Sequence, residues 1–343
     1  MAARLAAVLV AIAMVAVAFV ARDRLDDSDG EDGGRSGPLV LGCVTELNAV
    51  CEALLDVDGI EVRVGQAGEV ATALADPADA SSLDAWLTLA PWPGLVDSRR
   101  QHAGASAVFD GSATVARSPL VMVIWPDRAA TLARRCVADV GTWRCLGDAA
   151  AAGGWAASGG EASWGAVKLG LADPATSGIG ALVLAQATLG WFDRDDVSLF
   201  DLETDDGYRR WLTGLEAAVR SRSGGELEQM LLAPAALDAV AATEARAVEL
   251  LSRLASGRRR PEVIYPPPMA TADVVLATIG DRGGRLEDAV ADRLARALAD
   301  AGWRVPGEPR PIVPEDPALP ASNGLPPGDV LDALRTAWAE VAR

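Results

Sequence analysis

The distribution of apolar residues predicts alternating strands and helices from residue 38 onward. Short apolar or alternating runs predict strands at 38–43 (PLVLGC), 60–65 (IEVRVG) and 83–89 (LDAWLTL). Apolar positions at helical spacing predict helices at 47–55 and 68–75. Successive strand–helix units with apolar strands are typical of a parallel sheet covered by helices on both faces.

The same pattern continues to the end of the chain. Further strands are expected at 118–125 (SPLVMVIW), 167–171, 237–242, 262–265 and 273–279. Further helices are expected at 128–137, 178–190, 243–254 and 285–301. A turn at 91–94 (PWPG) should end the third strand. Six prolines within 306–320 predict an extended strap, which leads into a final helix at 329–342.

The amino-terminal segment differs from the rest because residues 5–21 form an uncharged apolar run of 17 residues. This length is the lower limit for crossing a bilayer and slightly exceeds the apolar core of a signal peptide. We favour an uncleaved signal anchor at 1–21, with a cleaved signal peptide as the alternative. Either kind of segment would export the rest of the chain. The expected location is the cell membrane, single-pass, with an extracytoplasmic soluble domain, or a secreted form after cleavage.

Residues 22–36 carry six acidic residues and three arginines, without an apolar cluster that could pack. This composition is typical of a solvated tether between an anchor and a folded domain.

The cysteines fall into two local pairs, which are Cys43 with Cys51 and Cys136 with Cys145. Exported chains keep disulfides, and four cysteines allow three connectivities. We expect the two local pairings, with free buried thiols as the alternative.

Composition and charge exclude several classes of function. The chain of 343 residues carries 31 Lys and Arg against 48 Asp and Glu, a formal net charge of −17, which argues against a nucleic-acid partner. His102 is the single histidine, so Ser-His-Asp and Cys-His catalysis would both have to use it. No metal-ligand spacing, phosphate loop or dinucleotide fingerprint occurs. We therefore expect no catalytic residue, metal or cofactor, and a binding protein rather than an enzyme.

The order of elements and several short motifs resemble type 2 periplasmic solute-binding proteins of the sulfate and molybdate type, over roughly residues 37–304. The motifs are the strand–Thr–Glu–helix opening at 43–48, Asp84-Ala85-Trp86-Leu87, the crossing strand at 116–121, the turn 170–178 (GLADPATSG) and Gly302-Trp303-Arg304. The turn is similar to the ADP-x-T/S-G turn of that family and is the most specific of the five.

A related resemblance is to bacterial membrane proteins in which such a domain precedes a von Willebrand A domain. The DxSxS metal motif of that second domain is absent from this sequence. Metal-dependent adhesion is therefore not carried over.

The resemblance implies an α/β fold of two lobes joined by two crossing hinge strands, with ligand held between the lobes. Lobe 1 would comprise 37–118 and 244–303, and lobe 2 would comprise 119–243. The hinge would lie near Ser118 and 242–243, and residues 304–343 would form the strap and final helix.

Ligands of such folds meet the carboxyl ends of strands and the amino ends of helices. By position, this criterion selects Thr45, Trp86, Thr88, Ser118, Thr176, Ser177, Thr243 and Tyr265 as candidate ligand-binding residues. It also selects Glu46, whose charge would repel an anion and whose simpler role is to interact with the helix dipole.

Several of these residue types have ordinary structural roles as well. Thr45, Ser177 and Thr243 are suitable helix N-caps, and Trp86 is suited to a core. The hydroxyl groups together could accept an oxyanion, which makes an oxyanion one candidate ligand, although Glu46 argues against it.

Two functions fit the sequence. The first is a membrane-anchored extracytoplasmic solute-binding protein that captures a small polar ligand between two lobes and serves an ABC-type transporter. The second is a degenerate binding fold that acts as an envelope scaffold or sensor. The anchor, tether and strap favour the second function somewhat.

Overall fold

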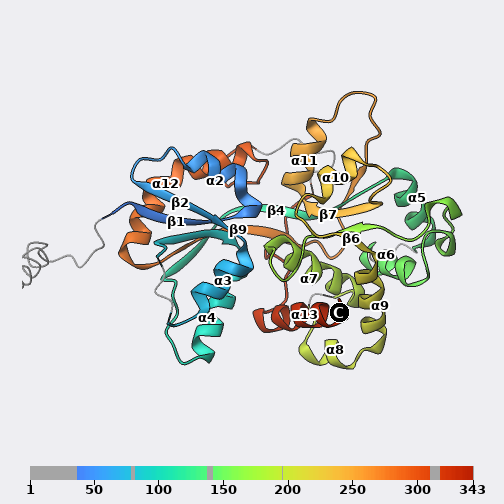
Figure 1. Cartoon of the computed structure of the whole chain (residues 1–343), viewed down its shortest axis with the longest axis horizontal. Helices are drawn as coiled ribbons and strands as arrows, with labels where there is room; N and C mark the ends of the chain where they lie inside the picture. Colours follow the sequence, from blue (N-terminus) through green and yellow to red (C-terminus); the bar gives the residue numbers. More distant parts are fainter. Residues whose placement is uncertain (1–36, 79–81, 137–141, 195, 310–316, 343) are drawn as a thin grey trace, which may run out of the picture. The chain divides into compact units, whose positions relative to one another are not determined.

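The computed structural model describes residues 37–78, 82–136, 142–194, 196–309 and 317–342. Their strands form one sheet in the order β2-β1-β3-β9-β4-β7-β5-β6, with β8 paired to β4 off this path (Figure 1). The strands of the described chain are β1 (Leu39–Val44), β2 (Ile60–Gly65), β3 (Ala85–Leu89), β4 (Gly111–Ile124), β5 (Leu169–Gly170), β6 (Val219–Ser221), β7 (Ala239–Thr243), β8 (Glu262–Ile264) and β9 (Thr271–Thr278).

Strand β4 joins two parts of this sheet. From Gly111 to Pro119 it pairs with β9, and from Leu120 to Ile124 it pairs with β7. We call β1, β2, β3, β9 and the elements packed on them the first half, and the elements around β5, β6, β7 and β8 the second half. The change of partner lies next to Ser118, where the sequence suggested a hinge.

The sheet is mixed, whereas the sequence predicted a parallel sheet. The pairs β1–β2, β1–β3, β5–β6 and β5–β7 are parallel, but β9 is antiparallel to both β3 and β4, and β4 is antiparallel to β7. The antiparallel pairs arise because β4 passes from the first half to the second and β9 returns beside it. A buried apolar run has the same pattern in either direction, so the sequence pattern could not show this.

Helices cover both faces of the first half. Figure 1 shows α2 (Asn48–Leu54) and α12 (Gly280–Asp300) on one face, and α3 (Ala67–Ala75) and α4 (Trp92–His102) on the other. Helix α4 begins inside the segment where we predicted a turn. Pro93 is compatible with a helix there because the first turn does not need its N–H group.

The second half is built around α7 (Gly178–Phe192), whose residues are buried on almost every side. Such an all-round apolar helix is stable only inside a core. The other helices of the second half are α5 (Pro126–Arg135), α6 (Thr142–Ala151), α8 (Leu199–Thr204), α9 (Asp206–Ala218), α10 (Glu226–Leu232), α11 (Glu244–Ser252) and α13 (Gly328–Val341). The second half also has short 3-10 turns at Ala156–Ser158 and Ala162–Trp164, and the first half has one at Thr45–Leu47.

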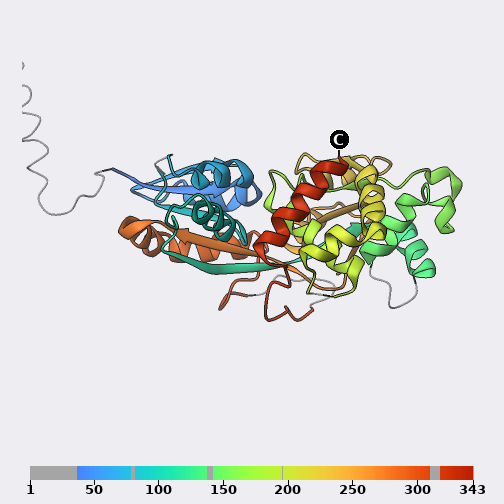
Figure 2. The same ribbon diagram turned by 90° about the horizontal axis from the view of Figure 1, so that it is seen from below.

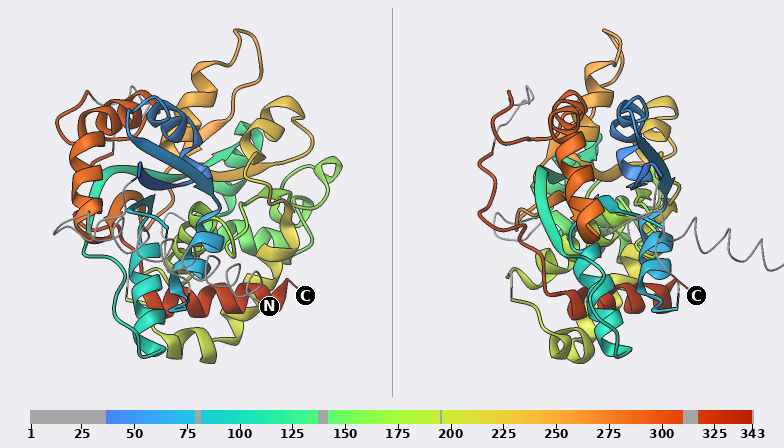
Figure 3. Two further views of the ribbon diagram at one scale, coloured as in Figure 1. Left: turned by 60° about the vertical axis from the view of Figure 1, so that its left-hand side comes forward. Right: turned by 90° about the vertical axis from the view of Figure 1, so that its left-hand side faces the viewer.

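Helix α13 contacts both halves. It packs on α7, α8 and α9 of the second half and on α4 of the first half, as the red helix in Figures 2 and 3 shows. Its buried side chains include Leu331, Leu334 and Trp338. The final helix that the strap was expected to reach is therefore part of the folded core.

The grouping of residues 244–264 differs from the lobe boundaries expected from sequence. Helix α11 packs on β4, β7 and α10, and β8 pairs with the second part of β4, so both lie in the second half. The chain returns to the first half between β8 and β9, rather than at 242–243. The physical reason is that β7 leads directly into α11, whose Ala247 joins a small apolar cluster with Val121 and Val240.

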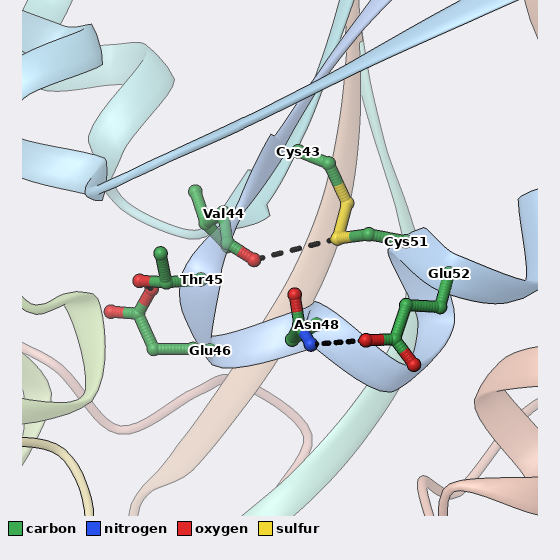
Figure 4. Close-up of a disulfide and its surroundings, with 7 residues drawn as sticks. All are labelled: Cys43, Val44, Thr45, Glu46, Asn48, Cys51 and Glu52. Atoms are coloured by element: carbon green, nitrogen blue, oxygen red, sulfur yellow. Dashed lines mark hydrogen bonds between the residues drawn. A yellow bond between two sulfur atoms is a disulfide. The ribbon is translucent and has the colours of Figure 1, made fainter. Parts of the chain in front are cut away.

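Both local disulfide pairings are confirmed. Cys43–Cys51 joins the end of β1 to α2 (Figure 4). Cys136–Cys145 joins the end of α5 to α6, and the Cα–Cα distance is 6.1 Å in both disulfides. The first disulfide therefore fixes the segment that connects β1 to α2.

No helix in the described part of the chain is both long enough and apolar enough to cross a membrane. The anchor predicted at 1–21 and the tether predicted at 22–36 lie outside the described residues.

Candidate functional site

A cavity of about 320 Å³ lies between the two halves. The first half contributes the 3-10 turn and α2 after β1, together with Ala301 and Trp303 after α12. The second half contributes Ala172, Ser177 and Ile179, and parts of α10, β7 and α11. Ligand pockets of proteins range from roughly 300 to 1,000 Å³, so this cavity suits a small molecule.

The topology of the sheet explains the position of the cavity. Strand β1 ends at Val44 and β7 ends at Thr243, and each is followed directly by a helical segment that lines the cavity. Helix α7 also begins at the cavity, after the turn that follows β5. Carboxyl ends of strands and amino ends of helices therefore converge there, which is where α/β folds bind ligands.

Acidic residues outnumber basic ones in the lining. Its charged residues are Glu46, Glu52, Glu226, Glu228, Glu249 and Arg246. The guanidinium of Arg246 pairs with both Glu228 and Glu249, and the Glu226 carboxylate accepts a hydrogen bond from the Gly224 amide at 2.8 Å. The excess of carboxylates disfavours an anionic ligand and favours a neutral or positively charged one.

Glu46 connects the first half to the start of α7. Its Oε1 atom accepts hydrogen bonds from Ser177 Oγ at 3.0 Å and from the Gly178 amide at 2.6 Å. Ser177 is also the N-cap of α7, since its Oγ accepts from the Gly180 amide at 3.1 Å. The sequence suggested a dipole role for Glu46 with its own helix; the structure shows it at the amino end of a different helix.

Three of the eight candidate ligand-binding residues line the cavity, namely Thr45, Ser177 and Thr243. Thr243 is the N-cap of α11, and its Oγ1 accepts from the Arg246 amide at 3.2 Å. Thr45 Oγ1 is 3.3 Å from a carboxylate oxygen of Glu46, to which it donates. Figure 4 shows the side chains of Thr45 and Glu46 on the segment that follows Cys43.

The other five candidates do not line the cavity. Trp86, Thr88 and Ser118 are fully buried. Trp86 stacks on Phe109 at 6.1 Å between ring centroids, while Ser118 Oγ accepts from the Ala245 amide at 3.0 Å. These three side chains are therefore buried and are not part of the lining of this cavity.

Thr176 and Tyr265 hold neighbouring parts of the structure. The Thr176 carbonyl accepts from the Gly68 amide at 3.0 Å, which joins the turn before α7 to α3. The Tyr265 hydroxyl donates to Glu244 Oε2 at 2.7 Å. Glu244 in turn pairs with Arg304, with Nη2–Oε2 at 2.7 Å and Nε–Oε1 at 2.9 Å. This buried pair lies directly beside lining residues of both halves.

The acidic residues on α10 and α11 were not identified from the sequence. No element was predicted at 226–232, although Leu227, Met230 and Leu231 have the i, i+3, i+4 spacing of a helix. A second signal is the Gly224-Gly225 pair followed by two glutamates, since acidic residues are favoured in the first turn of a helix. No group of three or more His, Cys, Asp or Glu residues in the described regions is arranged to hold a metal ion.

Comparisons with known proteins identify the fold. No protein-family model and no curated protein matches the chain. Solved structures do match. Iron-bound HitA from Pseudomonas aeruginosa is 16% identical, with a TM-score of 0.58 over 90% of this chain and 100% of that one. The periplasmic binding protein AfuA from Actinobacillus pleuropneumoniae, with fructose-6-phosphate bound, is 12% identical, with a TM-score of 0.58 over 90% of this chain and 99% of that one.

A periplasmic thiamin binding protein is 11% identical, with a TM-score of 0.55 over 91% of this chain and 99% of that one. At these identities the likeness concerns the fold, and the fold is the two-lobed α/β fold of periplasmic binding proteins. That part of the sequence-based expectation is confirmed, while the sulfate and molybdate subtype and the link to von Willebrand A proteins stay predictions.

Proposed function

We propose that the protein is an extracytoplasmic solute-binding protein that captures a small polar solute in the cavity between its two halves. The observation that carries this proposal is that residues of both halves line one cavity at the ends of β1 and β7 and at the start of α7. A solute in this position would contact both halves at once. Its binding would therefore favour the conformation in which they lie together.

The proposed solute is neutral or positively charged. Five glutamates and one arginine line the cavity, and that arginine already pairs with two of the glutamates. An oxyanion would be repelled by this lining. Of the structures that this chain resembles, HitA is iron-bound, AfuA holds fructose-6-phosphate and the third is a thiamin binding protein, so the fold accepts solutes of very different chemistry.

The proposed cellular context follows from the amino-terminal sequence. The apolar run at 5–21 and the acidic segment at 22–36 support a membrane anchor and a tether, with the binding domain outside the cytoplasm. An ABC-type transporter is the proposed partner. The proposal keeps the lobes, the hinge and the strap as expected from the sequence, with 244–264 grouped in the second half. It keeps Thr45, Ser177 and Thr243 as ligand-binding residues, because these three line the cavity.

A thermal-shift screen of the full-length protein tests the proposal. The screen would compare amino acids, polyamines, sugars, sulfate and phosphate, each at several concentrations. A solute that binds the folded state raises the melting temperature by mass action, by an amount that grows with its concentration. We expect a shift from at least one neutral or cationic class and none from the oxyanions. No shift with any class would contradict solute capture.

A second candidate function is an envelope scaffold or sensor, and α13 is the observation that favours it. Arg335 on α13 donates to the carbonyls of Pro174 and Ala175 in the second half, at 2.9 and 2.8 Å. Asp332 on the same helix pairs with Arg99 of α4 in the first half at 2.7 Å. A helix that joins both halves would restrict hinge motion, as a scaffold requires. If the solute screen is negative while the fold is intact, this function replaces the first.

A further inference from the structure

The start of α7 has the donor geometry of an anion-binding site. Helix α7 has 15 residues, so its first amide groups and its dipole favour a negative charge at Gly178. The Ser177 hydroxyl and the Gly178 amide point at one common acceptor. That acceptor is Glu46 Oε1, from a residue more than 130 positions earlier in the chain and in the other half.

The two halves approach each other closely around this contact. A Cβ atom at Gly178 would lie 2.9 Å from Trp92 Nε1 and 3.0 Å from Leu89 Cδ1, both of the first half. At Gly68 of the first half, a Cβ atom would lie 2.5 Å from the backbone oxygen of Ala175. Glycine at both positions therefore permits the approach that brings Glu46 to α7.

We propose that Glu46 is an internal anion that occupies the anion-binding start of α7. Its carboxylate excludes oxyanions from this end of the cavity and joins the first half to the second. The inference deepens the proposed function and rests on it, because it assigns Glu46 as a specificity-determining residue of the same cavity. Hydrogen bonds to a charged acceptor are stronger than neutral ones, so an external oxyanion would have to displace a well-held group.

The test compares Glu46 with a matched residue of the same cavity. Glu52 also lines the cavity, but its carboxylate accepts from Asn48 Nδ2 at 2.7 Å and not from α7. Glu46→Gln and Glu52→Gln therefore remove the same charge from different positions. Glu46→Ala additionally removes the acceptor. Each full-length variant would be titrated with sodium sulfate, with sodium chloride at equal ionic strength as the reference, while the melting temperature is measured.

We expect a sulfate-specific rise in melting temperature in Glu46→Ala only. The wild type and Glu52→Gln should show no such rise up to sulfate concentrations about tenfold above the half-saturation of Glu46→Ala, the factor expected from one hydrogen bond to a charged group. Glu46→Gln keeps an oxygen acceptor and should keep excluding sulfate. If Glu46→Ala responds like the wild type, or if both glutamine variants gain the response equally, the proposal is overturned.

Amide hydrogen exchange gives a readout that does not require Glu46→Ala to fold. The Gly178 amide should exchange at least about tenfold faster in Glu46→Gln than in the wild type, because a neutral acceptor binds it more weakly. Glu52→Gln should leave it unchanged. Equal exchange in the wild type and Glu46→Gln would overturn the proposal. Sulfate and amide exchange do not involve the proposed solute, so a failed solute screen and a failed role for Glu46 are separate results.

Discussion

The buried ion pair between Glu244 and Arg304 offers a quantitative test of how the two halves are joined. The side chains are 1% and 6% exposed, and the guanidinium makes two hydrogen bonds to the carboxylate. Arg304 Nη1 also donates to the Pro317 carbonyl at 2.9 Å, and the Tyr265 hydroxyl donates to Glu244. Glu244 begins α11 of the second half, whereas Arg304 follows α12 of the first half.

The variant Glu244→Gln removes the negative charge while nearly preserving volume. It removes the charge that the buried Arg304 guanidinium contacts through two hydrogen bonds, and breaking a buried pair from one side costs about 3–5 kcal/mol. A typical domain is stable by roughly 5–15 kcal/mol, so this loss should be large relative to the total. The double variant Glu244→Leu with Arg304→Leu removes both charges and should recover much of the loss.

Urea unfolding of the full-length protein, followed by tryptophan fluorescence, measures these free energies. The exposed pair Glu61–Arg63 provides the control, and Glu61→Gln should leave the urea midpoint unchanged because surface pairs contribute little. A loss below about 1 kcal/mol for Glu244→Gln, the range of exposed pairs, would refute the reasoning. Such a small loss would mean that water or other groups compensate the charge of the Arg304 guanidinium in the variant.

Three further outcomes are expected. Replacing both cysteines of the Cys136–Cys145 disulfide with serine should lower the free energy of unfolding by roughly 2–3 kcal/mol in urea, as expected for a short closed loop. Hydrogen bonds from the Ser198 hydroxyl and amide, and a weaker contribution from the hydrogen bond of Arg194, lower the pKa of Asp201 from 3.8 to about 2. The contribution of Asp201 to stability is therefore present above pH 4 and is lost as the pH falls toward 2. An NMR titration of the Asp201 carboxyl group should give a pKa of about 2, and a pKa near 3.8 would contradict this prediction. Gly68→Ala should push α3 away from the turn before α7 and lower the melting temperature, because the added Cβ would lie 2.5 Å from the backbone oxygen of Ala175. An unchanged melting temperature would contradict this close approach.

The strands were the most predictable part of the fold. The alternating run at 60–65 coincides with β2, and the predicted strand at 262–265 differs from β8 by one residue. The run at 60–65 is recognisable because Ile60 and Val62, which pack against the core, alternate with the exposed Glu61 and Arg63. The direction of β9 was not predictable, because the pattern does not depend on direction.

The helices between residues 199 and 232 were not predicted. Helix α9 carries a clear signal, since Tyr208, Trp211, Leu212 and Leu215 are buried at i, i+3, i+4 and i+7 spacing. Helices α8 and α10 are only 6 and 7 residues long, so few apolar residues fall on one face of each. Glu226 and Glu228, which line the cavity from α10, were therefore not anticipated.

Position along the chain identified part of the site, since three of the eight residues that it selected line the cavity. Thr45, Ser177 and Thr243 follow strands or begin helices, and all three line the cavity. The contact between Glu46 and α7 depends instead on how the two halves pack, since its partners are 131 and 132 residues away in the chain. Local sequence carries no information about such a pairing.

The central claim is that a solute binds in the cavity between the two halves. Ala49 on α2 is exposed and lines the cavity, so Ala49→Trp should fill part of it without disturbing the core. Ala73 is an exposed alanine on α3 away from the cavity, and Ala73→Trp is the matched control. Isothermal titration of the solute found by the screen should show affinity at least about tenfold weaker for Ala49→Trp, which corresponds to about 1.4 kcal/mol, and unchanged affinity for Ala73→Trp. Equal affinity in the wild type and Ala49→Trp would contradict the claim.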